Sequence, residues 1–249
     1  MPPKYPILWD IAGKLMIAVL TSQQRKFSSD SVLGVDRINP ELKVIGVDRI
    51  ATAGPCIVTV NHYSRPGFRA WWLAMAVSAV IPYEVHWVMT AGWTFADSFR
   101  SNLITPLTRW VFTKVAEVYG FSTMPPMPPR ELDLYQRVQT IRDVISYVHS
   151  SQIPVVGLAP EGMDSGSGEL GLPPPGLGKF VLFLSKLGLC VLPVGIFEAD
   201  DRLIVSFGNP YRIEIKTKMN KSEQDRIVRW EVMNHIALLL PERLRGIFG

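Results

Sequence analysis

Two short polar segments of this chain have the residue types and the spacing for acid–base chemistry. The segment Asn61–Ser64 (Asn-His-Tyr-Ser) follows an apolar run, and Pro160–Gly162 (Pro-Glu-Gly) follows another such run much later in the chain. Polar residues beyond the carboxyl ends of parallel strands lie where an α/β sheet binds its ligands. His62 and Glu161 therefore share one cleft if their strands are neighbours. A histidine side chain, with an ordinary pKa of about 6.5, can act as a general base near pH 7.

These segments resemble the motifs of the glycerolipid acyltransferases, the family that makes lysophosphatidate and phosphatidate. The first motif of that family is Asn-His-x-Ser with an aspartate five positions after the histidine, and here that position is Gly67. The family aspartate orients the imidazole, which takes a proton from the acceptor hydroxyl as it attacks an acyl thioester. Pro-Glu-Gly and the segment at residues 191–195 (Val-Leu-Pro-Val-Gly) match two further motifs. The resemblance covers residues from about Val44 to Phe207 and implies the fold more securely than the activity.

The chain departs from the family at the positions that hold a phosphate headgroup. Family members follow Pro-Glu-Gly with Thr-Arg, whereas here Met163 and Asp164 follow. The middle motif, Gly-x-x-Phe-x-x-Arg, has no arginine in register near Gly120. Because guanidinium groups are the usual bidentate grip on a phosphate, we expect a lipid-like acceptor that lacks the usual glycerol phosphate.

The missing aspartate leaves the orientation of His62 to another carboxylate. Asp164 adds a negative charge where the family has a cation, and Glu161 lies in the same motif. We therefore predict that Asp164 or Glu161 orients the imidazole. The alternative for Asp164 is a turn cap, since Asp before Ser-Gly is a common turn signal.

The remaining candidate residues flank His62 and Glu161. Ser64, Arg65 and Gly162 are predicted to contact the substrate, with Asn61 bracing the loop through its side-chain amide. Arg65 could hold an anionic group of the acceptor or of the acyl carrier, or it could face solvent as a loop arginine. Trp71 and Trp72 are candidates for lining an acyl tunnel, and core packing of at least one is the alternative.

The elements around these residues alternate between strands and helices, as a largely parallel sheet requires. We predict one α/β domain at residues 31–249, with a mostly parallel central sheet flanked by helices. The expected strands are 43–47, 55–61, 84–90, 155–158, 190–197 and 202–207, the last as an edge strand. The expected helices are 70–80, 98–119, 131–149, 177–187 and 222–240.

Residues 1–30 are predicted to hold a separate amphipathic helix. Its apolar stretch, Ile7–Leu20, is shorter than the roughly 20 residues that span a bilayer and contains Asp10 and Lys14. With Trp9 at headgroup depth it suits the membrane interface, and packing over the domain is the alternative. We expect no cleaved signal peptide, because no small-residue cleavage site follows.

Composition agrees with a membrane-peripheral enzyme. Of 249 residues 47% are hydrophobic and 19% charged, with mean hydropathy +0.16 and net charge +4. We therefore expect a cytoplasmic protein at the inner face of a membrane, and no nucleic-acid partner, because the chain has no dense basic stripe. The histidines lack metal-ligand spacing, so neither a metal nor a cofactor is expected.

The leading hypothesis is a lipid-metabolism acyltransferase of phospholipid-biosynthesis type. Its acyl donor would be an acyl-CoA or acyl-carrier-protein thioester, its acceptor a lipid-like hydroxyl, and His62 its general base. The alternative is a weak relative that binds acyl chains or lipid without turnover. Retention of Asn-His-x-Ser and Pro-Glu-Gly favours catalysis, whereas Gly67 favours the alternative.

Overall fold

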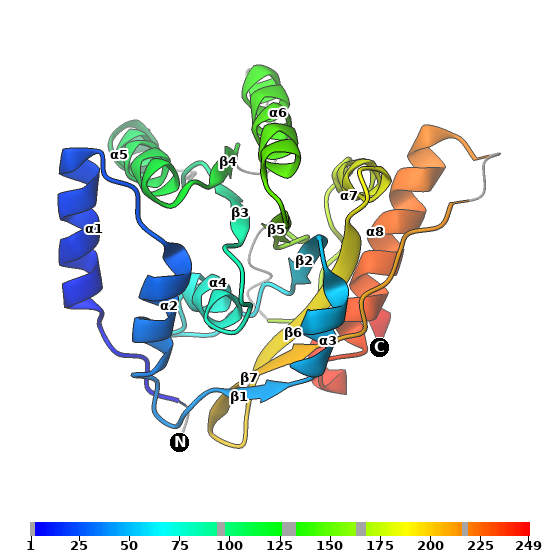
Figure 1. Ribbon diagram of the computed structural model, residues 1–249, viewed down its shortest axis with the longest axis horizontal. Helices are drawn as coiled ribbons and strands as arrows, with labels where there is room; N and C mark the ends of the chain where they lie inside the picture. The colour runs from blue at the N-terminus through cyan, green and yellow to red at the C-terminus, as the bar shows by residue number, and fades with distance from the viewer. Residues whose placement is uncertain (1–2, 94–97, 126–132, 163–167, 216–218) are drawn as a thin grey trace.

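The computed structural model describes residues 3–93, 98–125, 133–162, 168–215 and 219–249. Its strands, in chain order, are β1 (Lys43–Ile45), β2 (Cys56–Val60), β3 (His86–Thr90), β4 (Ser122–Met124), β5 (Val155–Leu158), β6 (Cys190–Ala199) and β7 (Arg202–Phe207). They form one sheet in the order β1-β7-β6-β2-β5-β3-β4 (Figure 1). Among the strands that the structure describes, only β6 and β7 pair antiparallel, so the predicted mostly parallel sheet is confirmed.

Helices cover both faces of this sheet. They are α1 (Trp9–Thr21), α2 (Phe27–Val35), α3 (Asp48–Ala53), α4 (Trp71–Ser78), α5 (Ser98–Tyr119), α6 (Leu134–Ser150), α7 (Leu177–Lys186) and α8 (Lys221–Ala237). In Figure 1, α1, α2 and α4 lie on one side of the sheet, and α7 and α8 lie on the other. Consecutive parallel strands need such crossover helices, because the chain must return to the starting end of the sheet before the next strand begins. A short hairpin joins only antiparallel strands.

Side-chain caps mark where two of these helices begin, one of them local and the other from a distant residue. The Asn220 carboxamide oxygen accepts hydrogen bonds from the backbone amides of Ser222 and Glu223, at 3.1 and 2.9 Å, so α8 begins at the next residue. The N-terminus of α7 is capped from another helix: the Asp225 carboxylate accepts from the amides of Gly176 and Lys179, at 3.1 and 3.0 Å. These contacts tie α7 to α8 over one face of the sheet.

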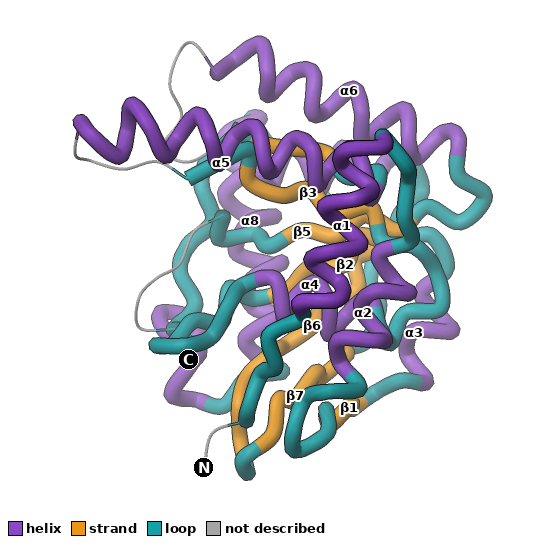
Figure 2. Tube along the Cα trace, turned by 90° about the vertical axis from the view of Figure 1, so that its left-hand side faces the viewer, coloured by secondary structure: helices purple, strands orange, loops and turns teal. Residues whose placement is uncertain are grey.

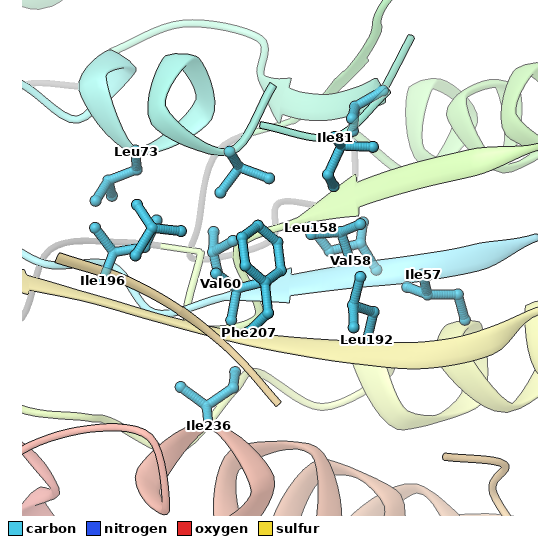
Figure 3. Close-up of a cluster of buried hydrophobic side chains, with 14 of the residues drawn as sticks. Ile57, Val58, Val60, Leu73, Ile81, Leu158, Leu192, Ile196, Phe207 and Ile236 are labelled. Carbon is cyan, nitrogen blue, oxygen red and sulfur yellow. The ribbon is translucent and has the colours of Figure 1, made fainter. Parts of the chain in front are cut away.

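The core lies between the sheet and these helices. Strand β2 is buried at all five residues, as expected of a parallel strand covered on both faces. Figure 3 shows Leu73 of α4 and Ile81 on one side of the sheet and Ile236 of α8 on the other, with strand residues between them. All three side chains are buried.

Some predicted elements need correction. Residues 202–207 were expected to form an edge strand, but β7 lies between β1 and β6 and is buried from Leu203 to Phe207. The short elements α2, α3 and β4 were not predicted. The predicted division at residue 30 falls inside α2, which packs against α4. The predicted helix over residues 131–149 begins at Leu134 in the described part of the chain.

Candidate active site

Strand β2 places the histidine segment at the carboxyl edge of the sheet. It pairs in parallel with β5 on one side and with β6 on the other, in registers that set Thr59 beside Leu158 and Val60 beside Val194. The segments that follow β2, β5 and β6 therefore leave the sheet at the same edge. Asn61–Ser64 follows the middle strand of the three.

Asn61 braces its loop against β6, in the way that its amide suggested. The side chain is 1% exposed, and its Nδ2 donates to the Ile196 carbonyl at 2.8 Å. The Ile196 amide donates back to Asn61 Oδ1 at 2.7 Å. The carboxamide thus continues the backbone pairing of β2 and β6 one residue beyond the end of β2, and leaves neither buried backbone group of Ile196 unsatisfied.

Glu161 joins the histidine segment to the loop that follows β5. Its carboxylate is 7% exposed, and Oε2 accepts a hydrogen bond from the His62 backbone amide at 2.6 Å. Oε1 accepts from the Gly171 amide at 2.8 Å. One buried carboxylate therefore holds two loops, and these two contacts are both to backbone amides. The structure brings Glu161 and His62 together, because β2 and β5, the strands that precede them, are neighbours in the sheet.

His62 itself is half-buried, and its Nδ1 atom is shielded from solvent. Gly67, where the resemblance led us to look for an aspartate, has φ of +84°. A side chain there would be strained by its backbone conformation, and its Cβ would lie 3.5 Å from Arg65 Nη1. Gly67 therefore lies in a turn that favours glycine. Asp164, the other predicted orienting carboxylate, lies outside the described residues.

Arg65 is engaged within the protein. Its Nε and Nη2 atoms donate to the Glu198 carboxylate at 2.5 and 2.7 Å, and Nη1 donates to the Pro66 carbonyl at 2.8 Å. The hydrogen bond to Glu198 raises the pKa of Arg65 above its usual value. In this structure Arg65 therefore fastens the loop to β6, and its charge is balanced by Glu198.

The other predicted residues differ in burial and backbone contacts. Ser64 is half-buried, and its carbonyl oxygen lies so close to Gly168 that a Cβ on Gly168 would come within 2.8 Å of it. Gly162 has φ of +70° and donates to the Ala159 carbonyl at 3.1 Å, which closes a turn. Trp72 is buried in the core, whereas Trp71 is exposed.

His86 is a structural residue of β3. Its Nε2 lies 2.8 Å from the Ser122 hydroxyl, and its ring stacks on Tyr147 with 4.3 Å between the centroids. Burial lowers the pKa of His86 to about 4, against a smaller opposing effect of the Gly120 backbone. The imidazole is therefore neutral near pH 7 and is committed to packing between β3, β4 and α6.

Two residues of the site, Glu198 and Tyr5, were not predicted. Glu198 lies near the carboxyl end of β6, in the same kind of position that identified His62 and Glu161, so the same criterion would have found it. Tyr5, whose hydroxyl donates to Glu198 at 2.6 Å, had no signal of this kind. Within the described residues, no group of three or more His, Cys, Asp or Glu side chains is arranged to hold a metal ion.

This chain is similar to known proteins in structure and not in sequence. No protein-family model matches the chain, and no curated protein matches it in sequence. Among solved structures, the chain is similar to the 1-acyl-sn-glycerophosphate (LPA) acyltransferase PlsC from Thermotoga maritima, with a TM-score of 0.46 and 14% identity over 92% of this chain and 89% of that one.

Proposed function

We propose that this protein is an acyltransferase that moves a fatty acyl group from a CoA or acyl-carrier-protein thioester to a hydroxyl of a lipid-like acceptor. The observation that supports the proposal is the convergence of Asn-His-x-Ser and Pro-Glu-Gly. Glu161 Oε2 lies 2.6 Å from the His62 amide, although the two residues are 99 positions apart in the chain. A histidine at the carboxyl edge of a parallel sheet, with its backbone held in place, suits general-base chemistry.

In the proposed reaction His62 takes the proton of the acceptor hydroxyl. The acceptor oxygen then forms a bond to the thioester carbonyl carbon, and the tetrahedral intermediate collapses by breaking the carbon–sulfur bond. The departing thiolate takes the proton from the imidazolium, so the histidine is restored and no acyl-enzyme forms. Positioning the hydroxyl, imidazole and thioester in one geometry supplies much of the rate in such a step.

We assign the supporting roles from the contacts of each side chain. Glu161 positions His62 through its backbone amide, and Asn61 holds the same loop to β6. Asp164 stays our candidate for a carboxylate that orients the imidazole. Ser64 and Gly162 remain proposed substrate contacts, because Ser64 lies two residues after His62 and Gly162 directly follows Glu161. Arg65 would bind an anionic substrate group only by sharing or leaving Glu198.

The second candidate is a lipid-binding relative without turnover, which Gly67 favours because no carboxylate can come from that position. The test is thiol release by the whole chain from acyl-CoA and acyl-carrier-protein thioesters, with lysolipid, glycerol phosphate and neutral acceptors. We expect release that depends on a lipid-like acceptor without a glycerol phosphate. Saturable acyl-ligand binding without release would establish the second candidate instead.

We also propose that the protein docks on an anionic membrane surface through α1 and α5. Both helices expose an apolar stripe: Trp9, Met16, Ile17 and Leu20 on α1; Leu103, Leu107 and Trp110 on α5. The two helices contact each other, and Figures 1 and 2 both show them on the same side of the molecule. Exposed tryptophans on apolar stripes suit the headgroup region. No helix in the described part of the chain is both long and apolar enough to cross a bilayer.

Membrane docking can be tested with a matched pair of leucines. Leu20 on α1 is 76% exposed, and Leu238, beyond α8 on the other side of the sheet, is 73% exposed. We expect Leu20→Ser to lower partitioning onto vesicles with anionic lipid about tenfold, because a leucine side chain contributes roughly 1.5 kcal/mol on burial. Leu238→Ser should partition as the wild type does. Equal partitioning of the two variants would rule out α1 as the docking surface.

A further inference from the structure

Glu198 collects hydrogen bonds from two segments that are far apart in the chain. In the segment around His62, Arg65 donates to the Glu198 carboxylate through Nε and Nη2 at 2.5 and 2.7 Å. The Tyr63 hydroxyl lies 3.5 Å from Glu198 Oε2. From the N-terminal side, the Tyr5 hydroxyl donates to Oε1 at 2.6 Å. The carboxylate is only 10% exposed, so these contacts replace most of its hydration. Hydrogen bonds to an ionised, partly desolvated carboxylate are among the stronger ones in proteins.

Tyr5 also contacts the loop that carries His62 (residues 61–68). Its ring meets the Phe68 ring edge-on, with 5.2 Å between centroids, and the Arg65 guanidinium carbon lies 5.8 Å from the Tyr5 ring centroid. The Trp72 ring, at the start of α4, also packs against Tyr5, with 5.4 Å between the ring centroids. Tyr5 therefore contacts both the loop and α4.

The backbone around Tyr5 is fixed as well. Lys4 and Asn39 exchange two backbone hydrogen bonds, at 2.9 and 3.3 Å, which tie the N-terminal segment to the residues after α2. Burial, and then the hydrogen bond to Glu198, raise the pKa of Tyr5 well above its ordinary value. The Tyr5 hydroxyl therefore stays protonated and remains a donor across the physiological pH range.

His62 lies between two attachments of its loop to the same strand. Asn61 is fastened to Ile196, and Arg65 is fastened to Glu198, two residues further along β6. We infer that Tyr5 and Glu198 are positioning residues for the His62 loop (residues 61–68), so that the segment before α1 completes the site. Because α1 begins four residues after Tyr5, any surface that binds α1 is joined to this loop by a short, anchored link.

This positioning role goes beyond the proposed acyl transfer, since it concerns the loop whatever reaction the loop serves. Amide hydrogen exchange of the whole chain tests it without any assay of activity. Tyr5→Phe removes one hydroxyl and keeps the packed ring. Loss of a hydrogen bond to a charged group should accelerate exchange in the peptide over residues 61–70 about tenfold, with exchange in β7 unchanged. Tyr135→Phe, at an exposed tyrosine of α6, is the matched control and should change neither region.

A double variant shows whether Tyr5 acts through Glu198. Glu198→Gln should accelerate exchange over residues 61–70 more than Tyr5→Phe does, and adding Tyr5→Phe to it should produce little further change. Fully additive effects, no change in Tyr5→Phe, or equal acceleration throughout the chain would each overturn the inference. If thiol release is found, Tyr5→Phe should lower kcat while the KM for the thioester stays near its wild-type value. If no thiol release is found, the exchange result still decides the positioning role.

Discussion

Replacing His62 with alanine is expected to lower acceptor-dependent thiol release by about 10²- to 10⁴-fold, the usual contribution of a general base. The loop should keep its place in this variant, because Asn61 and Glu161 hold it through contacts that do not involve the imidazole. The midpoint of denaturant unfolding should therefore stay close to the wild-type value. Steady-state thiol release at saturating thioester and acceptor, measured beside an unfolding curve, checks both expectations.

His149 provides the matched control for this variant. It lies in the last turn of α6 with an exposed side chain, so His149→Ala removes an imidazole without touching the proposed site. We expect wild-type thiol release from it. Release at the wild-type rate from His62→Ala would remove His62 from its assigned role and require another group to take the proton.

The strands that position the site were predictable from apolar runs in the sequence. Strands β2, β5 and β6 are runs of mostly β-branched or apolar residues, and in the structure every residue of β2 and β5 is buried. Such runs are typical of parallel strands, which are covered on both faces. Because polar residues follow each run, the sequence also predicted which edge of the sheet would carry the site.

The prediction that residues 202–207 form an edge strand was wrong, because a strand of only three residues, β1, lies outside them in the sheet. Alternation in residues 202–207 suggested an edge strand, yet β1, with three residues, pairs with β7 and makes it internal. Helix α2 was missed for a related reason. Its sequence, Phe-Ser-Ser-Asp-Ser-Val-Leu-Gly-Val, has little helical periodicity, and its helix depends on packing against α4. Gly34 lies at this contact: a Cβ there would overlap the terminal methyl group of Met75, so the Met75 side chain would have to shift.

Within the site, the contacts that could not be predicted from the sequence join residues far apart in the chain. Arg65 was predicted to meet the substrate because it stands beside His62 in the chain. Its partner, Glu198, is 133 positions away, and only the register of β2 against β6 brings the two together. Charge balance and the expected closeness of the two motifs suggested Asp164 or Glu161 as the carboxylate that orients the imidazole. Neither argument supplied the contact between Glu161 and the backbone amide of His62. Motif spacing thus predicts proximity but leaves the atoms in contact undetermined.

Glu161→Gln is expected to lower both stability and turnover. The glutamine has the same shape, but its carboxamide has one oxygen and one NH2 group where the carboxylate had two oxygens. Either the His62 amide or the Gly171 amide then faces another donor and loses its buried acceptor. The cost of such an unsatisfied donor, together with the lost charge-assisted bond, is about 2 to 4 kcal/mol of unfolding free energy. Denaturant unfolding measures it, with the exposed Glu41→Gln as a control that should show no change.

Measurements of turnover distinguish two roles for Glu161: stabilising the fold, or positioning the loop that carries His62. If Glu161 positions His62, the Glu161→Gln protein that remains folded should still bind the thioester while its kcat falls about 10²-fold, because a displacement of roughly 1 Å is enough to misalign proton transfer. Measuring kcat and KM well below the unfolding midpoint excludes loss of folded protein as the cause. A lower unfolding free energy with wild-type kcat would limit Glu161 to joining the two loops. Wild-type stability and wild-type kcat together would contradict the role of the carboxylate in both.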